Sequence, residues 1–285
     1  MQQRLQVNLQ KNDFVANRLI EAYLFGEDHP YGKYSRAEDY DALQRSELQA
    51  FYEKYYRNGR CIIIAAGVLP ADLPQQLEAS FGGLALNQQA LPQLKYQVQP
   101  AAEKKYRVPN NAESVQGSIR MARDFPNRHH PDFPKMQVLN NVLGGFFGSR
   151  LMDNIREDKG YTYGIHSYLL NHISTSGLVI STEAGRDVCE ATITEVNKEL
   201  ELLCNDLIPE DELQLTQNYL VGSILSDLDG PFQVANRWKN YILSGLGAEH
   251  FYNNIEVIRT ITPESLREVA QRYLDPSAFY ELVVV

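Results

Sequence analysis

The chain has 285 residues, of which 44% are hydrophobic and 22% charged, and its formal net charge is −9. This length and apolar content suffice for one large or two ordinary domains with hydrophobic cores. An acidic protein without a basic run is a poor candidate for binding nucleic acid or an anionic membrane. The sequence has no apolar run near 18 residues and no apolar signal core after Met1, so we expect a soluble chain without a membrane-spanning segment.

The first 84 residues predict three helices and one strand. Apolar residues at helical spacing indicate a helix over residues 1–24, and a turn-rich loop follows at residues 28–32. Residues 46–55 and 70–81 show the same helical spacing. Between them, the run Cys-Ile-Ile-Ile-Ala-Ala-Gly at residues 61–67 is typical of a short buried strand.

A linker and a second unit are expected after residue 84. Residues 85–103 are rich in Gln, Ala and Pro without periodicity, which indicates a linker that allows two domains to face one another. From residue 104 onward, strands are predicted at residues 118–125, 161–170 and 177–184. Helices are predicted at residues 132–143, 187–203 and 209–228.

The end of the chain repeats its beginning. Residues 14–18 recur as residues 232–237, and the strand at residues 62–65 recurs as residues 280–283 at an offset of 218. A helix–loop–helix–strand unit that occurs twice indicates duplicated domains. The first copy is incomplete, because nothing before it corresponds to residues 104–200.

The most informative stretch is residues 139–168, LNNVLGGFFGSRLMDNIREDKGYTYGIHSY. One helical pattern stops at Gly144-Gly145, a second ends at Gly160, and an aromatic strand pattern begins at once. Glycine at a helix end can adopt left-handed backbone angles, so we expect sharp turns at both places. Arg156 lies between these turns and Tyr163 just beyond them. Their guanidinium and phenol would point into one space and hold a polarised carbonyl oxygen.

This stretch resembles the signature of the second, non-catalytic domain of the pitrilysin/insulinase-type zinc metallopeptidases, which include the mitochondrial processing peptidases. The family pattern is Leu-Gly-Gly, then Ser-Arg-Leu, then Leu-Arg-Glu-Lys-x-Gly, then an aromatic strand. Here the pattern reads Leu143-Gly144-Gly145, Ser149-Arg150-Leu151, Ile155-Arg156-Glu157-Asp158-Lys159-Gly160 and Tyr161-Thr162-Tyr163. The match is long and has few gaps, so it is specific.

The resemblance implies a duplicated α+β fold in which each domain has a mainly antiparallel sheet with helices on one side. Two such domains would close like a clamshell. Residues 1–84 would be the back half of the first peptidase-like domain, residues 85–103 the linker, and residues 104–285 the complete, inactive second domain. In active relatives, the residues that match Arg156 and Tyr163 bind the substrate backbone or the oxyanion near the zinc, so the same role is expected here.

Other residues of the stretch have expected roles as well. Tyr161 shares the odd-numbered side of the predicted strand with Tyr163 and is expected to line the same cavity. Arg150 is expected to hold the turn together through hydrogen bonds. The glycines are expected to be structural and not to contact a ligand; they are Gly144, Gly145 and Gly160.

A second interpretation of the candidate site needs no ligand. In this alternative, Arg156 pairs with Glu157 or Asp158 on a helix surface. Tyr163 then packs within the sheet.

The motif that binds zinc in active members of this family is missing from the sequence. That motif, H-x-x-E-H with a further Glu downstream, needs two imidazoles on one helical face and a Glu that takes a proton from the bound water. None of the six His residues has a partner at i, i+4 spacing, and the three Cys residues show no C-x-x-C spacing. We therefore expect no metal site and no catalytic residue in this chain, with zinc in the complete enzyme. His29, in the loop His-Pro-Tyr-Gly, is expected to pack that loop.

Two functions remain open from the sequence. In the first, the chain is the substrate-holding portion of a zinc peptidase and is inactive alone. Its partners are a peptide substrate and a zinc-bearing peptidase domain, in the same full-length chain or in a partner subunit. In the second, it is an inactive scaffold or partner subunit of a processing-peptidase-like complex. A second copy of the chain, in a homodimer, is a further candidate partner.

Overall fold

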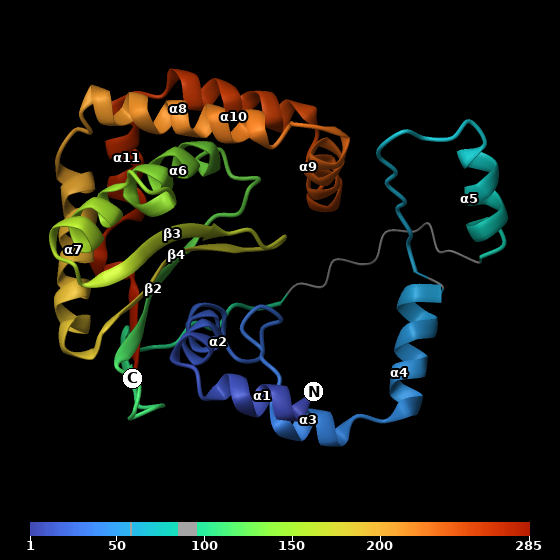
Figure 1. The fold of residues 1–285 in the computed structure, drawn as a ribbon, viewed down its shortest axis with the longest axis horizontal. Helices are drawn as coiled ribbons and strands as arrows, with labels where there is room; N and C mark the ends of the chain where they lie inside the picture. The colour runs from blue at the N-terminus through green and yellow to red at the C-terminus, as the bar shows by residue number, and fades with distance from the viewer. Residues whose placement is uncertain (58, 85–95) are drawn as a thin grey trace. The chain divides into compact units, whose positions relative to one another are not determined.

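The computed structural model describes residues 1–57, 59–84 and 96–285. Within these residues, a five-stranded sheet has the order β1-β5-β2-β4-β3, in which β1 runs parallel to β5 and the other neighbours are antiparallel (Figure 1). The strands are β1 (Lys105–Val108), β2 (Gln116–Phe125), β3 (Thr162–Leu170), β4 (Ser176–Gly185) and β5 (Tyr280–Val284). The predicted α+β fold with a mainly antiparallel sheet is confirmed, and β1 is the strand that the sequence did not predict.

The helices of the described residues are α1 (Gln2–Leu9), α2 (Asn12–Phe25), α3 (Ala37–Ala42), α4 (Arg45–Phe51), α5 (Leu73–Phe81), α6 (Phe133–Asn140), α7 (Cys189–Asn205), α8 (Glu210–Ser226), α9 (Pro231–Ser244), α10 (Ala248–Thr260) and α11 (Pro263–Tyr273). Wider π-type turns form η1 (Tyr52–Arg57), η2 (Asn141–Gly145) and η3 (Met152–Asp158), and 3-10 turns form η4 (Arg186–Val188) and η5 (Pro276–Ala278). The single helix predicted at residues 1–24 is divided into α1 and α2, and the one at residues 132–143 into α6 and η2.

Helix α2 covers one face of the sheet (Figure 1). Its residues Ile20 and Leu24 are buried together with Leu282 and Val284 of the inner strand β5 and Val179 of β4. Side chains alternate between the faces of a strand, so every second residue of β5 points towards α2. Burial of each large apolar side chain stabilises the fold by about 1.5–3 kcal/mol relative to exposure.

Helices α6, α7 and α11 lie on the opposite face (Figure 1). Arg123 of β2 donates a hydrogen bond to the carbonyl oxygen of Tyr273 in α11 at 3.0 Å, and Asn197 of α7 donates to Glu281 of β5 at 3.4 Å. Arg123 and Glu281 alternate with the residues that face α2, which places them on the other side of the sheet. The predicted helical layer is therefore present, and α2 adds a second layer.

The chain divides into two units whose boundaries differ from those of the predicted domains. The first, here called the sheet unit, contains residues 1–34, 96–222 and 248–285, and the second, the small unit, contains the described part of residues 35–95 together with residues 223–247. The two helices of the sequence repeat lie in different units. Helix α2 lies on the sheet, whereas its counterpart α9 lies in the small unit. The assignment of residues 1–84 and 104–285 to two ancestral domains stays a prediction. Most of the predicted linker, residues 85–95, lies outside the described residues.

The strand predicted at residues 61–67 is wrong for this structure. Residues 61–66 have no regular secondary structure, and Ile62, Ile63 and Ile64 are 42%, 46% and 39% exposed. Their counterpart β5 is buried at every position and is bonded to strands on both sides. A strand needs a neighbouring strand for its N–H and C=O groups, and the described residues of the small unit contain none.

The sharp turns predicted at the glycines are present. Gly160 has a left-handed backbone, with φ at +65°. At Gly144-Gly145 the helical backbone is interrupted by a kink at Gly144, where φ is −162° and ψ is 17°, although neither glycine has a positive φ. Space explains Gly144 instead. A Cβ at this position would lie 2.7 Å from Oγ of Ser167 and 2.9 Å from Cδ1 of Leu151, so the absence of a side chain lets η2 pass close to β3.

Gly144→Ala is therefore expected to destabilise the fold by about 1–3 kcal/mol, because the buried neighbours must shift to admit the methyl group. Urea unfolding of the two proteins measures this difference. Gly164→Ala is the matched control on β3, since the nearest atom to its Cβ, in His166, lies at an ordinary 3.6 Å. Equal losses of stability in both variants would contradict the steric explanation.

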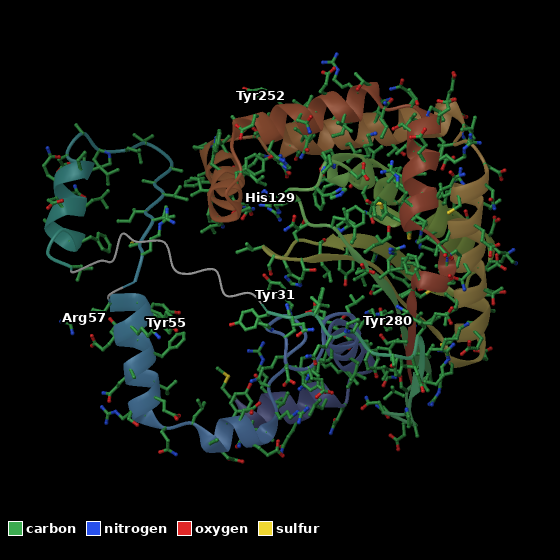
Figure 2. All side chains as sticks on the ribbon, turned by 180° about the vertical axis from the view of Figure 1, so that it is seen from behind. Tyr31, Tyr55, Arg57, His129, Tyr252 and Tyr280 are labelled. Carbon is green, nitrogen blue, oxygen red and sulfur yellow. The ribbon has the colours of Figure 1, made fainter. Side chains whose placement is uncertain are left out.

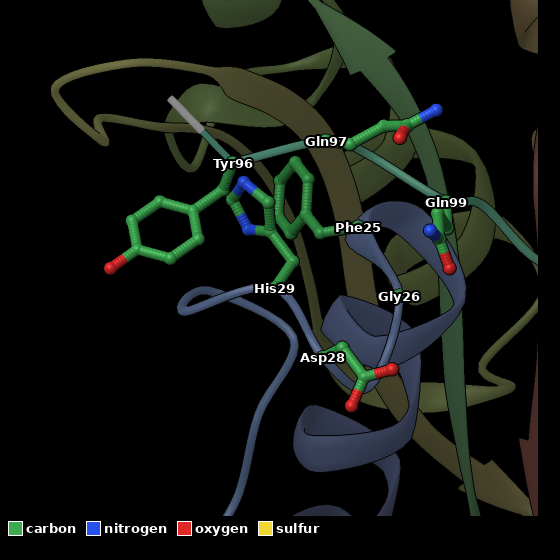
Figure 3. A pocket seen from close by; sticks show the side chains of 7 residues that line it. All are labelled: Phe25, Gly26, Asp28, His29, Tyr96, Gln97 and Gln99. Atoms are coloured by element: carbon green, nitrogen blue, oxygen red, sulfur yellow. The ribbon is translucent and has the colours of Figure 1, made fainter. Parts of the chain in front are cut away.

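The loop after α2 is packed by aromatic rings. His29 is 4% exposed, its Nδ1 accepts a hydrogen bond from the backbone N–H of Tyr31 at 3.2 Å, and its ring lies 5.7 Å from that of Phe25. Tyr31 in turn stacks on His172 in the β3–β4 turn, with ring centroids 4.0 Å apart. His29, Phe25 and Tyr96 line a hollow of ≈ 170 Å³. Figure 3 shows their three rings close together. The expected packing role of His29 agrees with this arrangement.

His172→Phe is expected to make the folded state less sensitive to acid. Burial lowers the pKa of His172, and His29 adds to this effect. The pKa of histidine in the unfolded chain is about 6.5. The neutral His172 ring therefore makes its full contribution to folding stability above that pH, and this contribution is lost as the pH falls towards the lower pKa of the folded state. Phenylalanine keeps an aromatic ring but cannot take a proton. The decrease in Tm between about pH 7.5 and 5.5 should be smaller in this variant.

The control for this comparison is His166→Phe, which changes an exposed ring on β3. It should retain the pH dependence of the wild-type protein. A His172→Phe protein whose Tm falls with pH as steeply as that of wild type would show that His172 does not carry the effect.

Candidate functional site

The guanidinium of Arg156, in η3, lies beside two aromatic rings. Its Cζ is 4.8 Å from the centroid of the Phe147 ring and 5.7 Å from that of Tyr163. Both distances lie within the range of about 6 Å in which a cation is attracted to the face of an aromatic ring. Nη1 of Arg156 also forms an ion pair with Glu157. The structure thus brings Arg156 and Tyr163 together, and it contains the Glu157 pairing of the alternative interpretation as well.

The rings of Tyr163 and Phe147 face solvent, whereas the side chain of Arg156 is mostly covered. Tyr163 is 89% exposed and Phe147 67% exposed, but the side chain of Arg156 is only 27% exposed. The alternative in which Tyr163 packs within the sheet is therefore wrong. The arrangement presents a charged donor group and a neutral phenol donor at an open surface, where both can reach an acceptor on another molecule.

Tyr161 lies in a different environment from Tyr163. It is half-buried. The Glu195 carboxylate raises the pKa of Lys198 in α7, and the Tyr161 phenol contributes to the same rise, which places Tyr161 towards α7. The pairing of β3 with β4 is irregular between residues 162 and 165, so the alternation of side chains does not continue through this point. That Tyr161 lines the cavity of Tyr163 stays a prediction.

Arg150 connects the start of η3 with α8. Its Nε and Nη2 donate to the two carboxylate oxygens of Glu212 at 2.7 and 2.8 Å. Burial alone would lower the pKa of Arg150, but the hydrogen bonds to Glu212 and the nearby carboxylates outweigh burial and raise the pKa above its ordinary value. The hydrogen bonds predicted for Arg150 are therefore present, and their partner is a helix about sixty residues away and not the turn itself.

Two buried polar residues that the sequence did not single out fix the helical segment against β3. Nδ2 of Asn140 donates to the carbonyl oxygen of Ser167 at 3.2 Å, and Oγ of Ser167 donates to the carbonyl oxygen of Asn140 at 3.1 Å. Both residues are less than 8% exposed, so these bonds form in a dry environment, where an unmade bond costs most. They fix the end of α6 against β3, the strand that carries Tyr163.

The described residues show neither a metal cluster nor a membrane-spanning helix. No group of three or more His, Cys, Asp or Glu residues among residues 1–57, 59–84 and 96–285 is arranged to hold a metal ion. In the same part of the chain, no helix combines the length and apolar character that crossing a bilayer requires.

Comparison with known proteins identifies relatives. The sequence profile of the family described as "Peptidase M16 inactive domain" matches residues 42–220. The chain is 24% identical over 237 residues to the "Uncharacterized zinc protease YmxG" of Bacillus subtilis, an alignment that covers 82% of this chain and 56% of that protein. The chain therefore spans little more than half the length of this curated relative.

Two solved structures share the fold. A protease from Helicobacter pylori has a TM-score of 0.86 at 17% identity, with 99% of this chain and 69% of that chain covered. A chain of complex III2 from Candida albicans has a TM-score of 0.75 at 14% identity, with 99% and 68% covered. Together with the profile match over more than half of its length, these findings confirm the resemblance to zinc metallopeptidases: the chain belongs to the peptidase M16 inactive-domain family.

Proposed function

We propose that this chain is the substrate-holding, non-catalytic portion of a zinc-dependent peptidase that hydrolyses peptides in a two-domain clamshell chamber. The observation that carries the proposal is the pairing of Arg156 with Tyr163 at an exposed surface of a peptidase-family domain. A guanidinium supplies a planar set of charged donors, and a phenol supplies a neutral one. Both suit a carbonyl oxygen that gains negative charge during hydrolysis.

The zinc and its ligands would come from a peptidase domain in the same full-length chain or in a partner subunit. A bound zinc would supply the nucleophile by making a water molecule acidic, with a Glu to take its proton. The named zinc proteases that resemble this chain are longer than it, which supports a metal-bearing segment outside these 285 residues. The part of this chain that would act in the reaction is the donor pair of Arg156 and Tyr163.

The exposed first copy of the repeat supports a missing half-domain. In α11 of the second copy, Leu266, Val269 and Ala270 are fully buried. The corresponding residues of the first copy are 55–56% exposed; they are Leu48, Phe51 and Tyr52. Tyr55 and Arg57 project from the same segment (Figure 2). We propose that residues 1–84 are the back half of the first peptidase-like domain and that its other half covers these residues.

The test combines metal analysis with a peptide hydrolysis assay. The purified 285-residue chain should contain no stoichiometric zinc and should not cleave peptides. Co-purification with the polypeptide that carries H-x-x-E-H, from upstream coding sequence or an adjacent gene, should give about one zinc per assembly and should restore hydrolysis. One tightly held zinc in the 285-residue chain, together with peptide cleavage, would overturn the proposal.

The second candidate function is an inactive scaffold or partner subunit of a processing-peptidase-like complex. The shared fold with a chain of complex III2 favours it. In this case, the complex that contains the chain would assemble without any H-x-x-E-H partner, and Arg156→Ala would leave its activity unchanged. A homodimer of the chain stays a prediction, which its molar mass in solution tests.

A further inference from the structure

Two aromatic rings lie beside the Arg156 guanidinium, and that of Phe147 is the nearer one. The centroid of its ring is 4.8 Å from Cζ of Arg156, whereas that of Tyr163 is 5.7 Å away. The three side chains come from separate elements: Phe147 from the loop after η2, Arg156 from η3 and Tyr163 from β3. An arginine side chain has many rotamers, and fixing it before a ligand arrives lowers the entropy cost of binding. A ring on the guanidinium can provide this restraint.

The loop that carries Phe147 is fixed on both sides. The ring of Phe146 stacks on Tyr219 of α8, with centroids 4.5 Å apart. The N–H of Ser149 donates to the carbonyl oxygen of Phe146 at 3.2 Å, and Arg150 forms its paired hydrogen bonds with Glu212 of the same helix. Because α8 holds the loop through Phe146 before Phe147 and through Arg150 after it, Phe147 has a defined position although it is 67% exposed.

The charge next to Arg156 indicates which acceptor fits. Glu157 pairs with Nη1 and compensates the positive charge locally. The guanidinium then selects an acceptor on a ligand through the direction of its remaining N–H donors more than through its net charge. A neutral main-chain carbonyl of an extended peptide matches such donors better than a free carboxylate does.

We propose that Phe147 is a positioning residue: its ring and that of Tyr163 hold the Arg156 guanidinium so that its N–H donors meet a main-chain carbonyl of a bound peptide. The peptide contact rests on the proposed function. The restraint on Arg156 is a property of the 285-residue chain itself.

The restraint is measured by NMR on the 285-residue chain through the Nε–H signal of Arg156, which is assigned by its loss in Arg156→Lys. Phe147→Leu keeps an apolar side chain but removes the ring, so the heteronuclear NOE of this signal should fall. Phe147→Trp should retain it, because the indole also attracts a cation. Tyr252→Leu is the control: it removes an exposed aromatic ring from α10, away from Arg156, and should leave the signal at its wild-type value.

The consequence for catalysis is measured in the complete enzyme. Phe147→Leu is expected to lower kcat/KM about 2- to 5-fold, and Phe147→Trp to restore it. A wild-type NOE in Phe147→Leu, or equal effects of Phe147→Leu and Tyr252→Leu, would overturn the positioning proposal. A reduced NOE in Phe147→Leu combined with unchanged kinetics of Arg156→Ala would leave the restraint standing and overturn the proposed function.

Discussion

Replacing Arg156 by alanine in the complete enzyme is expected to lower kcat/KM by about 100- to 1000-fold, the usual cost of removing one donor to a developing oxyanion. The side chain would be absent both when the peptide binds and when charge develops on its carbonyl oxygen. The partners that Arg156 would lose, Glu157 and two exposed aromatic rings, lie at the surface, where each such contact contributes about 1 kcal/mol or less, so the Tm should change little. Steady-state kinetics on a peptide substrate provides the measurement.

Three further variants identify the origin of this loss. Arg156→Lys keeps the charge but not the planar set of donors, so an intermediate loss is expected. Tyr163→Phe removes one neutral hydroxyl donor and should cost less than Arg156→Ala. Arg259→Ala, in α10, removes an arginine from a different surface hollow and should have no effect. If Arg156→Ala and Arg259→Ala had the same kcat/KM, the transition-state role of Arg156 would be wrong.

Leu282→Ala is expected to destabilise the 285-residue chain by about 2–5 kcal/mol, because Leu282 is fully buried between β1 and β2 and against α2. Its counterpart in the first copy, at the same offset of 218, is Ile64, which is 39% exposed. Ile64→Ala should therefore change the stability by no more than about 0.5 kcal/mol. Urea unfolding followed by circular dichroism compares the two variants.

The same pair of variants tests the missing half-domain in the complete enzyme. There, the other half of the first peptidase-like domain would bury Ile64 as well, and Ile64→Ala should then lower the stability about as much as Leu282→Ala does. A small cost of Ile64→Ala in both proteins would mean that nothing covers this residue. The proposal for residues 1–84 would then fail.

Periodicity predicted the sheet well because its strands are long and have one or two buried faces. β2 and β4 pair over ten residues, and the repeat predicted β5 from the strand-like run at residues 62–65. β1 was missed because it has four residues, a partly exposed pattern and a Lys and an Arg among them. A short edge strand of this kind carries little hydrophobic signal.

The run at residues 61–67 was wrongly predicted to be a strand because its hydrophobic signal is strong. Its apolar composition is typical of a buried strand, but strand formation depends on neighbours that composition cannot supply. No strand among the described residues pairs with this run. Local sequence therefore predicted a preference, and tertiary context decided the structure.

The candidate site was predictable in its main members but not in its surroundings. The family pattern pointed to Arg156 and Tyr163, and the structure brings them together. Phe147 was not singled out, because an exposed aromatic residue next to glycines has no periodic signature. Likewise, the link from Arg150 to Glu212 joins residues far apart in the chain, and spacing rules reach only three or four residues along a helix.

The sheet unit and the small unit are joined by several stretches of the same polypeptide. The polypeptide passes between the sheet unit and the small unit four times: after Tyr34, before Tyr96, after Gly222 and before Ala248. A protease that cuts one of these crossings leaves the two units joined through the other three, so the units stay at high effective concentration. Each unit consists of more than one stretch of the chain, so no single contiguous fragment contains either unit.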